Sequence, residues 1–182
     1  MVPLLLMPAS ADSPQAFFDR VAAAIESTLG FPTLLMAPDL SDANAVEAWP
    51  RVFAELKGKY KVTERGLVMG CGAGARHAQY LALDHPADVI ACAALSADAW
   101  ASTEDCLNPV AIRPVRWLIG SSADASRGSL EQAACFQVEL AEAGCAVDFL
   151  DWDGKVNHLP DHAIENTLRF FNDLAGEARV AA

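Results

Sequence analysis

The residues of this chain most suited to chemistry surround a tight glycine-rich turn in the segment GLVMGCGAGARHA, residues 66–78. An apolar run leads through the small residues 70–74 into a predicted helix. A strand that turns so sharply into a helix brings its backbone close to another group. Such a turn can expose a nucleophile, cradle a pyrophosphate or hold a methyl donor. Cys71 supplies a thiol within it.

The elements around this turn alternate between apolar runs of strand length and longer amphipathic stretches. The predicted strands are residues 2–7, 33–37, 66–69, 89–95, 115–119 and 146–150, and the predicted helices are residues 14–29, 45–59, 75–84, 130–143 and 163–175. The strand segments are continuously apolar, which is typical of a sheet covered on both faces. The alternation predicts a mainly parallel sheet with functional residues at the carboxyl ends of its strands.

Length and composition indicate one globular domain spanning residues 1–182, with 53% hydrophobic and 20% charged residues. The formal net charge of −11 disfavours nucleic acids and anionic membrane surfaces as partners. No apolar run approaches the length of a membrane span, and no basic residue precedes Arg20, as it would in a signal peptide. The five cysteines lack paired spacing, which favours reduced thiols and a cytoplasmic location.

Two uses of the turn bind nucleotides, and each matches the sequence in part. The turn is similar to the first motif of class I methyltransferases, which bind S-adenosylmethionine, but Val68 stands where that motif has an acid. Gly70, Gly72 and Ala75 also fit the dinucleotide pattern G-x-G-x-x-[GA], which alone is weak evidence. Both uses need an acid at the end of the next strand, and Asp98 comes a few residues too late.

The third use accounts for nearly the whole chain, because three segments resemble those of α/β-hydrolases. The segment ERGLVMGCGAGARHAQYLALDHPADVIACAALSA resembles their nucleophile strand, turn, helix and next strand. VRWLIGSSADASRGSLEQAACFQVELAEAGCAVDFLDWDG resembles the strand and helix around the catalytic acid, and VNHLPDHAIENTLRFFNDL resembles the catalytic-histidine turn with its closing helix. The order nucleophile, acid, histidine is the order of that fold. The resemblance is strongest to small esterases grouped with polyhydroxybutyrate depolymerases and dienelactone hydrolases.

This resemblance implies a three-layer α/β sandwich with a mainly parallel sheet of about six strands. The N-terminal hairpin of most members is missing, and the short segment 97–114 leaves no room for a cap domain. The implied site is open, suits a small ester or acyl ligand, and uses no cofactor.

The nucleophile position of the resemblance falls on a glycine. The pattern G-x-Nu-x-G places Gly72 there, seven residues after Arg65 and fourteen before Pro86, as in such esterases. Glycine enters the strained backbone of this turn without steric cost, so the fold can survive while the chemistry is lost. The alternative nucleophile is Cys71, displaced by one residue and activated by His158.

The other two members of the implied triad are present. His158 corresponds to the general base, and Asp124 in GSSAD corresponds to the acid that orients it. Asp124 follows its strand glycine by four residues rather than the usual three, so Asp98 is the alternative acid. A metal site at His158 and His162 is not expected, because a proline separates them from a common helix and no third ligand is evident.

The resemblance also implies an oxyanion hole. Its donors are the backbone N–H of Ala73 and one from the turn after the first strand, which is either Ala9 or Ser10. Pro8 stands in that turn and has no N–H to donate.

The sequence therefore supports two classes of function and a third alternative. The first is a domain of esterase descent without ordinary serine hydrolase activity, acting in binding or regulation. The second is a working ester hydrolase with Cys71 as nucleophile. The further alternative is a domain that binds a nucleotide or S-adenosylmethionine at residues 70–74. The sheet edge left by the missing hairpin predicts a possible homodimer.

Overall fold

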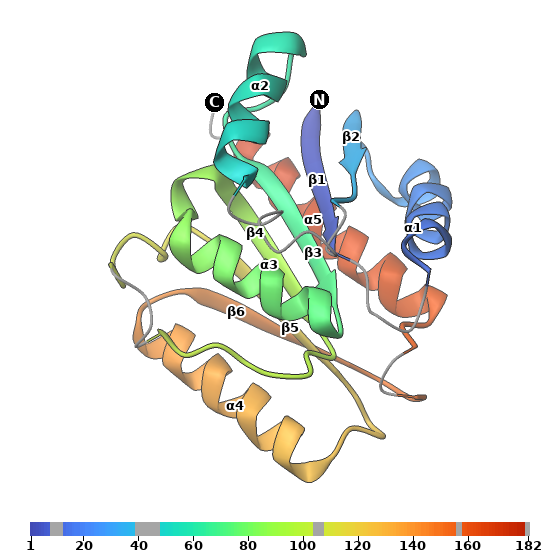
Figure 1. The fold of residues 1–182 in the computed structure, drawn as a ribbon, viewed down its shortest axis with the longest axis vertical. Coiled ribbons are helices and arrows are strands. Elements are labelled where there is room, and N and C mark those ends of the chain that lie inside the picture. Colours follow the sequence, from blue (N-terminus) through green and yellow to red (C-terminus); the bar gives the residue numbers. More distant parts are fainter. Residues whose placement is uncertain (8–12, 39–47, 104–107, 156–157, 181–182) are drawn as a thin grey trace.

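A six-stranded parallel sheet forms the centre of the molecule in a computed structural model (Figure 1). The structure describes residues 1–7, 13–38, 48–103, 108–155 and 158–180. The strands are β1 (Val2–Met7), β2 (Thr33–Met36), β3 (Gly66–Cys71), β4 (Val89–Leu95), β5 (Arg116–Ser122) and β6 (Ala146–Trp152). Their order across the sheet is β2-β1-β3-β4-β5-β6, and every neighbouring pair is parallel.

Helices cover both faces of this sheet (Figure 1). They are α1 (Pro14–Thr28), α2 (Trp49–Lys59), α3 (Ala73–Asp84), α4 (Arg127–Glu142) and α5 (Asp161–Val180), with a short 3₁₀ turn at Pro86–Asp88. One apolar core lies between the sheet and α1 with α5, around Phe17, Leu168 and Phe171. The other lies between the sheet and α2, α3 and α4, around Phe53 and Phe136. The fold is thus a three-layer α/β sandwich.

Serine caps account for the starts of α1 and α4. Ser13 caps α1 by accepting a hydrogen bond from the Ala16 N–H at 3.1 Å, and proline occupies the first helical position. Ser126 caps α4 in the same way through the Ser129 N–H at 3.2 Å.

The predicted elements are present, with small changes at their ends. Strands 2–7 and 89–95 were predicted with the observed bounds, and the sheet is parallel throughout its described strands. The predicted end of the third strand at residue 69 was wrong, because β3 continues to Cys71 and α3 begins at Ala73. The start predicted for the second helix, residue 45, lies outside the described residues. The described part of segment 96–115 adds no strand and no α-helix, in agreement with the absence of a cap domain.

Arg65 fastens the amino end of β3 to its neighbours. Its Nη2 donates hydrogen bonds to the carbonyl oxygens of Val89, Pro86 (3.4 Å) and Pro114 (3.4 Å). Burial lowers the pKa of this guanidinium from its usual value. Arg65 and Pro86, from which the position of the nucleophile was counted in the sequence, therefore contact each other at the amino end of β3, opposite the turn.

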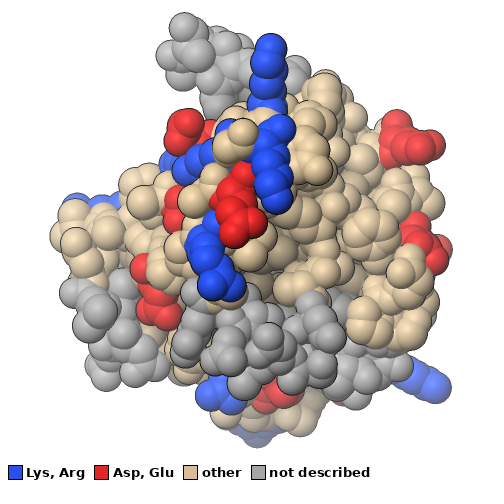
Figure 2. Space-filling view, turned by 45° about the horizontal axis from the view of Figure 1, so that its top comes forward, with Lys and Arg blue, Asp and Glu red and all other residues tan. Residues whose placement is uncertain are grey.

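Basic side chains gather in a band on one face, with acidic side chains among them (Figure 2). The lysines at the end of α2 belong to ion pairs: Lys57 Nζ lies 3.3 Å from Glu64 and 3.7 Å from Asp88, and Lys59 lies 4.0 Å from Glu55. Both lysines thus have acidic neighbours, in a chain whose formal net charge is −11.

Candidate functional site

The turn between β3 and α3 consists of a single residue, Gly72. Its φ of 58° and ψ of −126° lie in a region that residues with a side chain rarely adopt. Its N–H donates to the carbonyl of Leu95 at the end of β4 (2.9 Å), and its carbonyl accepts from the Ala75 N–H (3.0 Å). Gly72 is thus held between the neighbouring strand and the first turn of α3, at the carboxyl edge of the sheet.

Close contact between strand and helix explains the glycine before this turn. A Cβ atom on Gly70 would lie 2.3 Å from the carbonyl oxygen of Gly74 and 2.7 Å from the Cα of Ala75. Only glycine at position 70 permits α3 to leave the strand at this angle. Gly70 is thus needed for the close packing of β3 against α3, whereas Gly72 is needed for its unusual backbone conformation.

Cys71 belongs to the strand rather than to the turn. It is the last residue of β3, pairs in register with Leu95, and has only 2% of its surface exposed. Its side chain is part of the core beneath α1 and α5.

The two remaining triad candidates follow neighbouring strands. Asp124 lies in the loop between β5 and α4, and His158 lies in the loop between β6 and α5. The loops are joined near their starts, since the Ala123 N–H donates to the Trp152 carbonyl (2.8 Å). The Ser122 hydroxyl donates to the Gly154 carbonyl and accepts from the Asp124 N–H (3.1 Å).

The side chains of Asp124 and His158 form no hydrogen bond or ion pair with each other in this structure. Both residues are exposed, and the hydrogen bonds found among the described residues include none from the Asp124 carboxylate or the His158 imidazole. The His158 N–H donates to the Lys155 carbonyl (3.0 Å), which turns the chain toward α5. Asp98, the alternative acid, is also exposed, in the segment after β4. The structure thus places Asp124 and His158 after neighbouring strands and leaves the choice of acid open.

The predicted oxyanion donors are described only in part. Ala73 is the first residue of α3, so its N–H is among those that no intrahelical carbonyl can satisfy. Ala9 and Ser10 lie outside the described residues.

Ser96 is a buried polar residue of the same edge for which the sequence offered no role. It follows β4 directly, has φ 46°, and is 3% exposed. Its hydroxyl oxygen has no hydrogen-bond partner in the described structure, and the same holds for Ser121 on the next strand. Nothing in the sequence distinguishes Ser96 from any other serine at a strand end.

A metal site and a membrane-spanning helix each place requirements on the described residues. These residues contain no cluster of three or more histidine, cysteine, aspartate or glutamate side chains arranged for a metal ion. None of their helices is long and apolar enough to cross a membrane.

Sequence comparison finds no relative, since no family model and no curated protein matches the chain. Structure comparison finds several proteins named as esterases and variants of Arabidopsis thaliana SOBER1. A variant of Arabidopsis thaliana SOBER1 superimposes with a TM-score of 0.67 and 13% identity, covering 96% of this chain and 99% of the other. Esterase PE8 superimposes with a TM-score of 0.67 and 15% identity, covering 95% of this chain and 92% of the other. A Rhizomucor miehei esterase superimposes with a TM-score of 0.73 and 11% identity, covering 98% of this chain and 76% of the other. At such identities the likeness establishes the fold alone, which is that of the α/β-hydrolases.

Proposed function

We propose that this chain is an α/β-hydrolase-like protein of esterase descent that lacks ordinary serine hydrolase activity, because Gly72 occupies the nucleophile position. The observation that carries the proposal is the backbone of Gly72, with φ 58° and ψ −126° between a strand and a helix. The nucleophile of this fold sits on a strained turn of this kind, so that its side chain stands clear of the sheet. A hydrogen atom in that place can neither attack a carbonyl nor form an acyl-enzyme.

The surroundings of Gly72 support this register over a displaced one. The backbone of Gly74 lies so close to Gly70 that position 70 has no room for a side chain, which supports these two glycines as the small residues that flank the nucleophile in G-x-Nu-x-G. Cys71 has ordinary strand pairing and is almost entirely buried, so a substrate carbonyl would have to enter the core to reach its sulfur. Cys71 as a working nucleophile remains the alternative that the experiment must test.

What the chain retains is suited to holding a small ester or acyl ligand. Ala73 presents a free helical N–H beside the turn, and His158 and Asp124 are exposed on loops that converge at the same edge of the sheet. An acid and a base without a nucleophile can still orient a carbonyl group. We therefore place the function in binding or regulation rather than in turnover.

The test is hydrolysis of p-nitrophenyl acetate by the native chain and by Gly72→Ser, with Gly72→Ala as the matched control. We expect no burst and at most slow turnover from the native chain and Gly72→Ala, because oriented donors alone give up to roughly 10³–10⁴-fold acceleration over water. We expect Gly72→Ser to exceed both by at least 10²-fold and to lose that gain when His158→Ala is added.

Two further outcomes would contradict the proposal. Rapid turnover by the native chain that disappears in Cys71→Ala would identify the displaced thiol as the nucleophile. Micromolar binding of S-adenosylmethionine or NAD, measured by calorimetry, would favour a nucleotide site at residues 70–74. A native chain without rapid turnover, an active Gly72→Ser and no nucleotide binding would together exclude both.

A further inference from the structure

We propose that Arg20 is a positioning residue that fixes the turn carrying His158. This inference rests on the proposed function, which gives His158 the role of the retained base. Arg20 lies on α1, about 140 residues away in the sequence, and nothing in its surroundings there predicts a link to the histidine turn.

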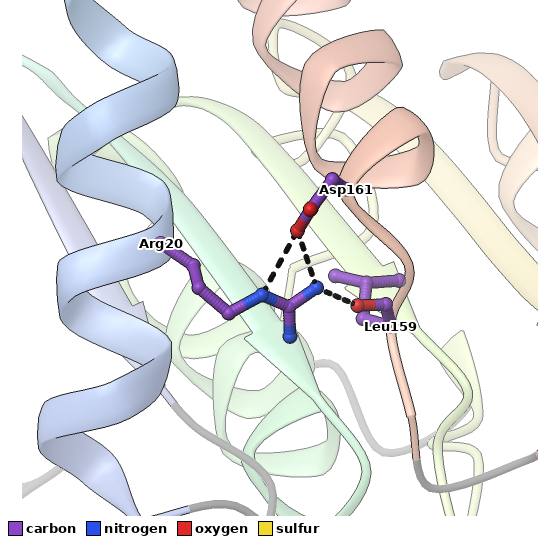
Figure 3. Close-up of polar contacts among 3 residues, drawn as sticks. All are labelled: Arg20, Leu159 and Asp161. Carbon is purple, nitrogen blue, oxygen red and sulfur yellow. Dashed lines mark hydrogen bonds and ion pairs between the residues drawn. The ribbon is translucent and has the colours of Figure 1, made fainter.

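The guanidinium of Arg20 binds the chain immediately after His158 at two points (Figure 3). Its Nε and Nη2 donate to one carboxylate oxygen of Asp161, at 3.0 and 2.8 Å. The same Nη2 donates to the backbone carbonyl of Leu159. One planar group thus holds a side chain of the first turn of α5 and the backbone of the residue next to the histidine.

Leu159 is fixed from its other side as well. Its side chain is 1% exposed and belongs to the core beneath α1 and α5. With its side chain in the core and its carbonyl on Arg20, Leu159 has little freedom to rotate. His158 is attached directly to it, so the direction in which the imidazole leaves the backbone depends on this contact.

The Asp161 contact aligns the start of α5 with the turn. Asp161 is the first residue of the helix, where a carboxylate also interacts favourably with the helix dipole. Its side chain is 80% exposed and that of Arg20 is 26% exposed, and exposed ion pairs add little to stability. The arrangement is therefore better suited to setting geometry than to holding the fold together.

Arginine is suited to this task in a way that lysine is not. Its fixed fork of donors reaches the carboxylate and the carbonyl together, whereas an ammonium group is a single mobile point charge. Arg20→Lys should retain the attraction to Asp161 and lose the defined geometry at Leu159. The two substitutions thus provide a graded test: Arg20→Lys keeps the charge, and Arg20→Met removes both the charge and the hydrogen bonds.

The first measurement is made on the native chain and does not depend on activity. The imidazole nitrogen shifts of the four histidines are recorded with ¹⁵N-histidine labelling, and His158→Gln assigns the His158 signals. We expect Arg20→Met to change the tautomer balance and line width of His158 while His77 and His85 stay unchanged. Arg169→Met, which removes an exposed pair with Glu165 on α5, should leave all four unchanged. An unaltered His158 spectrum in Arg20→Met overturns the proposal.

The second measurement uses the Gly72→Ser background. We expect Arg20→Met to lower kcat for p-nitrophenyl acetate about 10-fold with KM changed less than 2-fold, and to shift the pH midpoint of kcat/KM. Arg20→Lys should recover part of kcat, and Arg169→Met should retain all of it. If Gly72→Ser is active and adding Arg20→Met changes neither its kcat nor its pH profile, the proposal is overturned.

The two measurements separate this inference from the function on which it rests. If Gly72→Ser is inactive while the His158 spectrum depends on Arg20, the proposed nucleophile position is wrong and the positioning role of Arg20 stands. If Arg20→Met does not fold, Arg20→Lys carries the same comparison, and a native His158 spectrum in that variant overturns the proposal.

Discussion

A Cβ atom on Gly70 would lie 2.3 Å from the carbonyl oxygen of Gly74, well inside contact distance. Strand β3 passes into helix α3 through the single residue Gly72, and this short connection brings Gly74 against Gly70. The atoms that this Cβ would meet, the Gly74 carbonyl oxygen and the Ala75 Cα, belong to the backbone and not to a flexible side chain that could move away. Position 70, two residues before the strained turn, therefore has no room for a side chain.

The substitution Gly70→Ala tests this packing. We expect it to lower the free energy of unfolding by about 3 kcal/mol or more, because backbone rather than a side chain must move to make room. Urea unfolding followed by circular dichroism measures the loss. Gly58→Ala on α2 is the matched control, since no atom lies within 4 Å of its added Cβ, and it should gain about 0.5–1 kcal/mol. Equal behaviour of the two variants would contradict the contact.

The fold was largely predictable from the sequence, because β1, β3 and β4 are apolar runs that alternate with amphipathic stretches, and α1 and α4 begin at serine caps. The turn itself was less predictable. Five small residues in a row, 70–74, do not reveal that only Gly72 leaves regular structure, since Cys71 is as compatible with a strand as with a turn. The relation of Asp124 to His158 also lay beyond the sequence, because residue spacing fixes loops and not the directions of side chains.

The conformation of Gly72 gives a second prediction. A side chain at φ 58° and ψ −126° is strained, so Gly72→Ala should lower the free energy of unfolding by about 1–3 kcal/mol. Gly128→Ala near the start of α4 has open space around its Cβ and should not lose stability. Denaturant midpoints of the two variants decide the matter. If Gly72→Ala matches the native midpoint, the turn in solution does not have this conformation.

Thiol exposure predicts which cysteines react in the native state. Cys135 is exposed, whereas Cys71, Cys92 and Cys145 are buried. Iodoacetamide should label Cys135 within minutes, and the three buried thiols at least 10³-fold more slowly, because their reaction requires opening of the fold. Peptide mass spectrometry assigns each label, including that on Cys106, which lies outside the described residues. Fast labelling of Cys71 that is lost in His158→Ala would instead indicate an activated thiolate.

Burial of Cys92 predicts a loss of stability at alkaline pH. Desolvation raises the pKa of this fully buried thiol far above its usual value, and its Sγ donates to the Ala78 carbonyl at 3.5 Å. A raised pKa in the folded state stabilises the fold below the unfolded pKa, roughly 8.5, and this contribution is lost as pH rises above it. We expect the native chain to lose stability relative to Cys92→Ala as the pH rises above about 9. If the free energies of unfolding of the two proteins change in parallel with pH, this prediction is wrong.

The conformation of Ser96 predicts a substitution that stabilises the chain. A serine at φ 46° is strained, and its buried hydroxyl has no partner in the described structure. Its N–H donates to the Gly120 carbonyl at 2.8 Å, a contact that glycine retains. Ser96→Gly should therefore raise the free energy of unfolding by about 1–2 kcal/mol. Ser96→Ala removes the hydroxyl but keeps the strain, so urea unfolding should place it about 1 kcal/mol below Ser96→Gly. A loss of stability in both variants would mean that the hydroxyl makes a contact at the end of β4, next to the turn at Gly72.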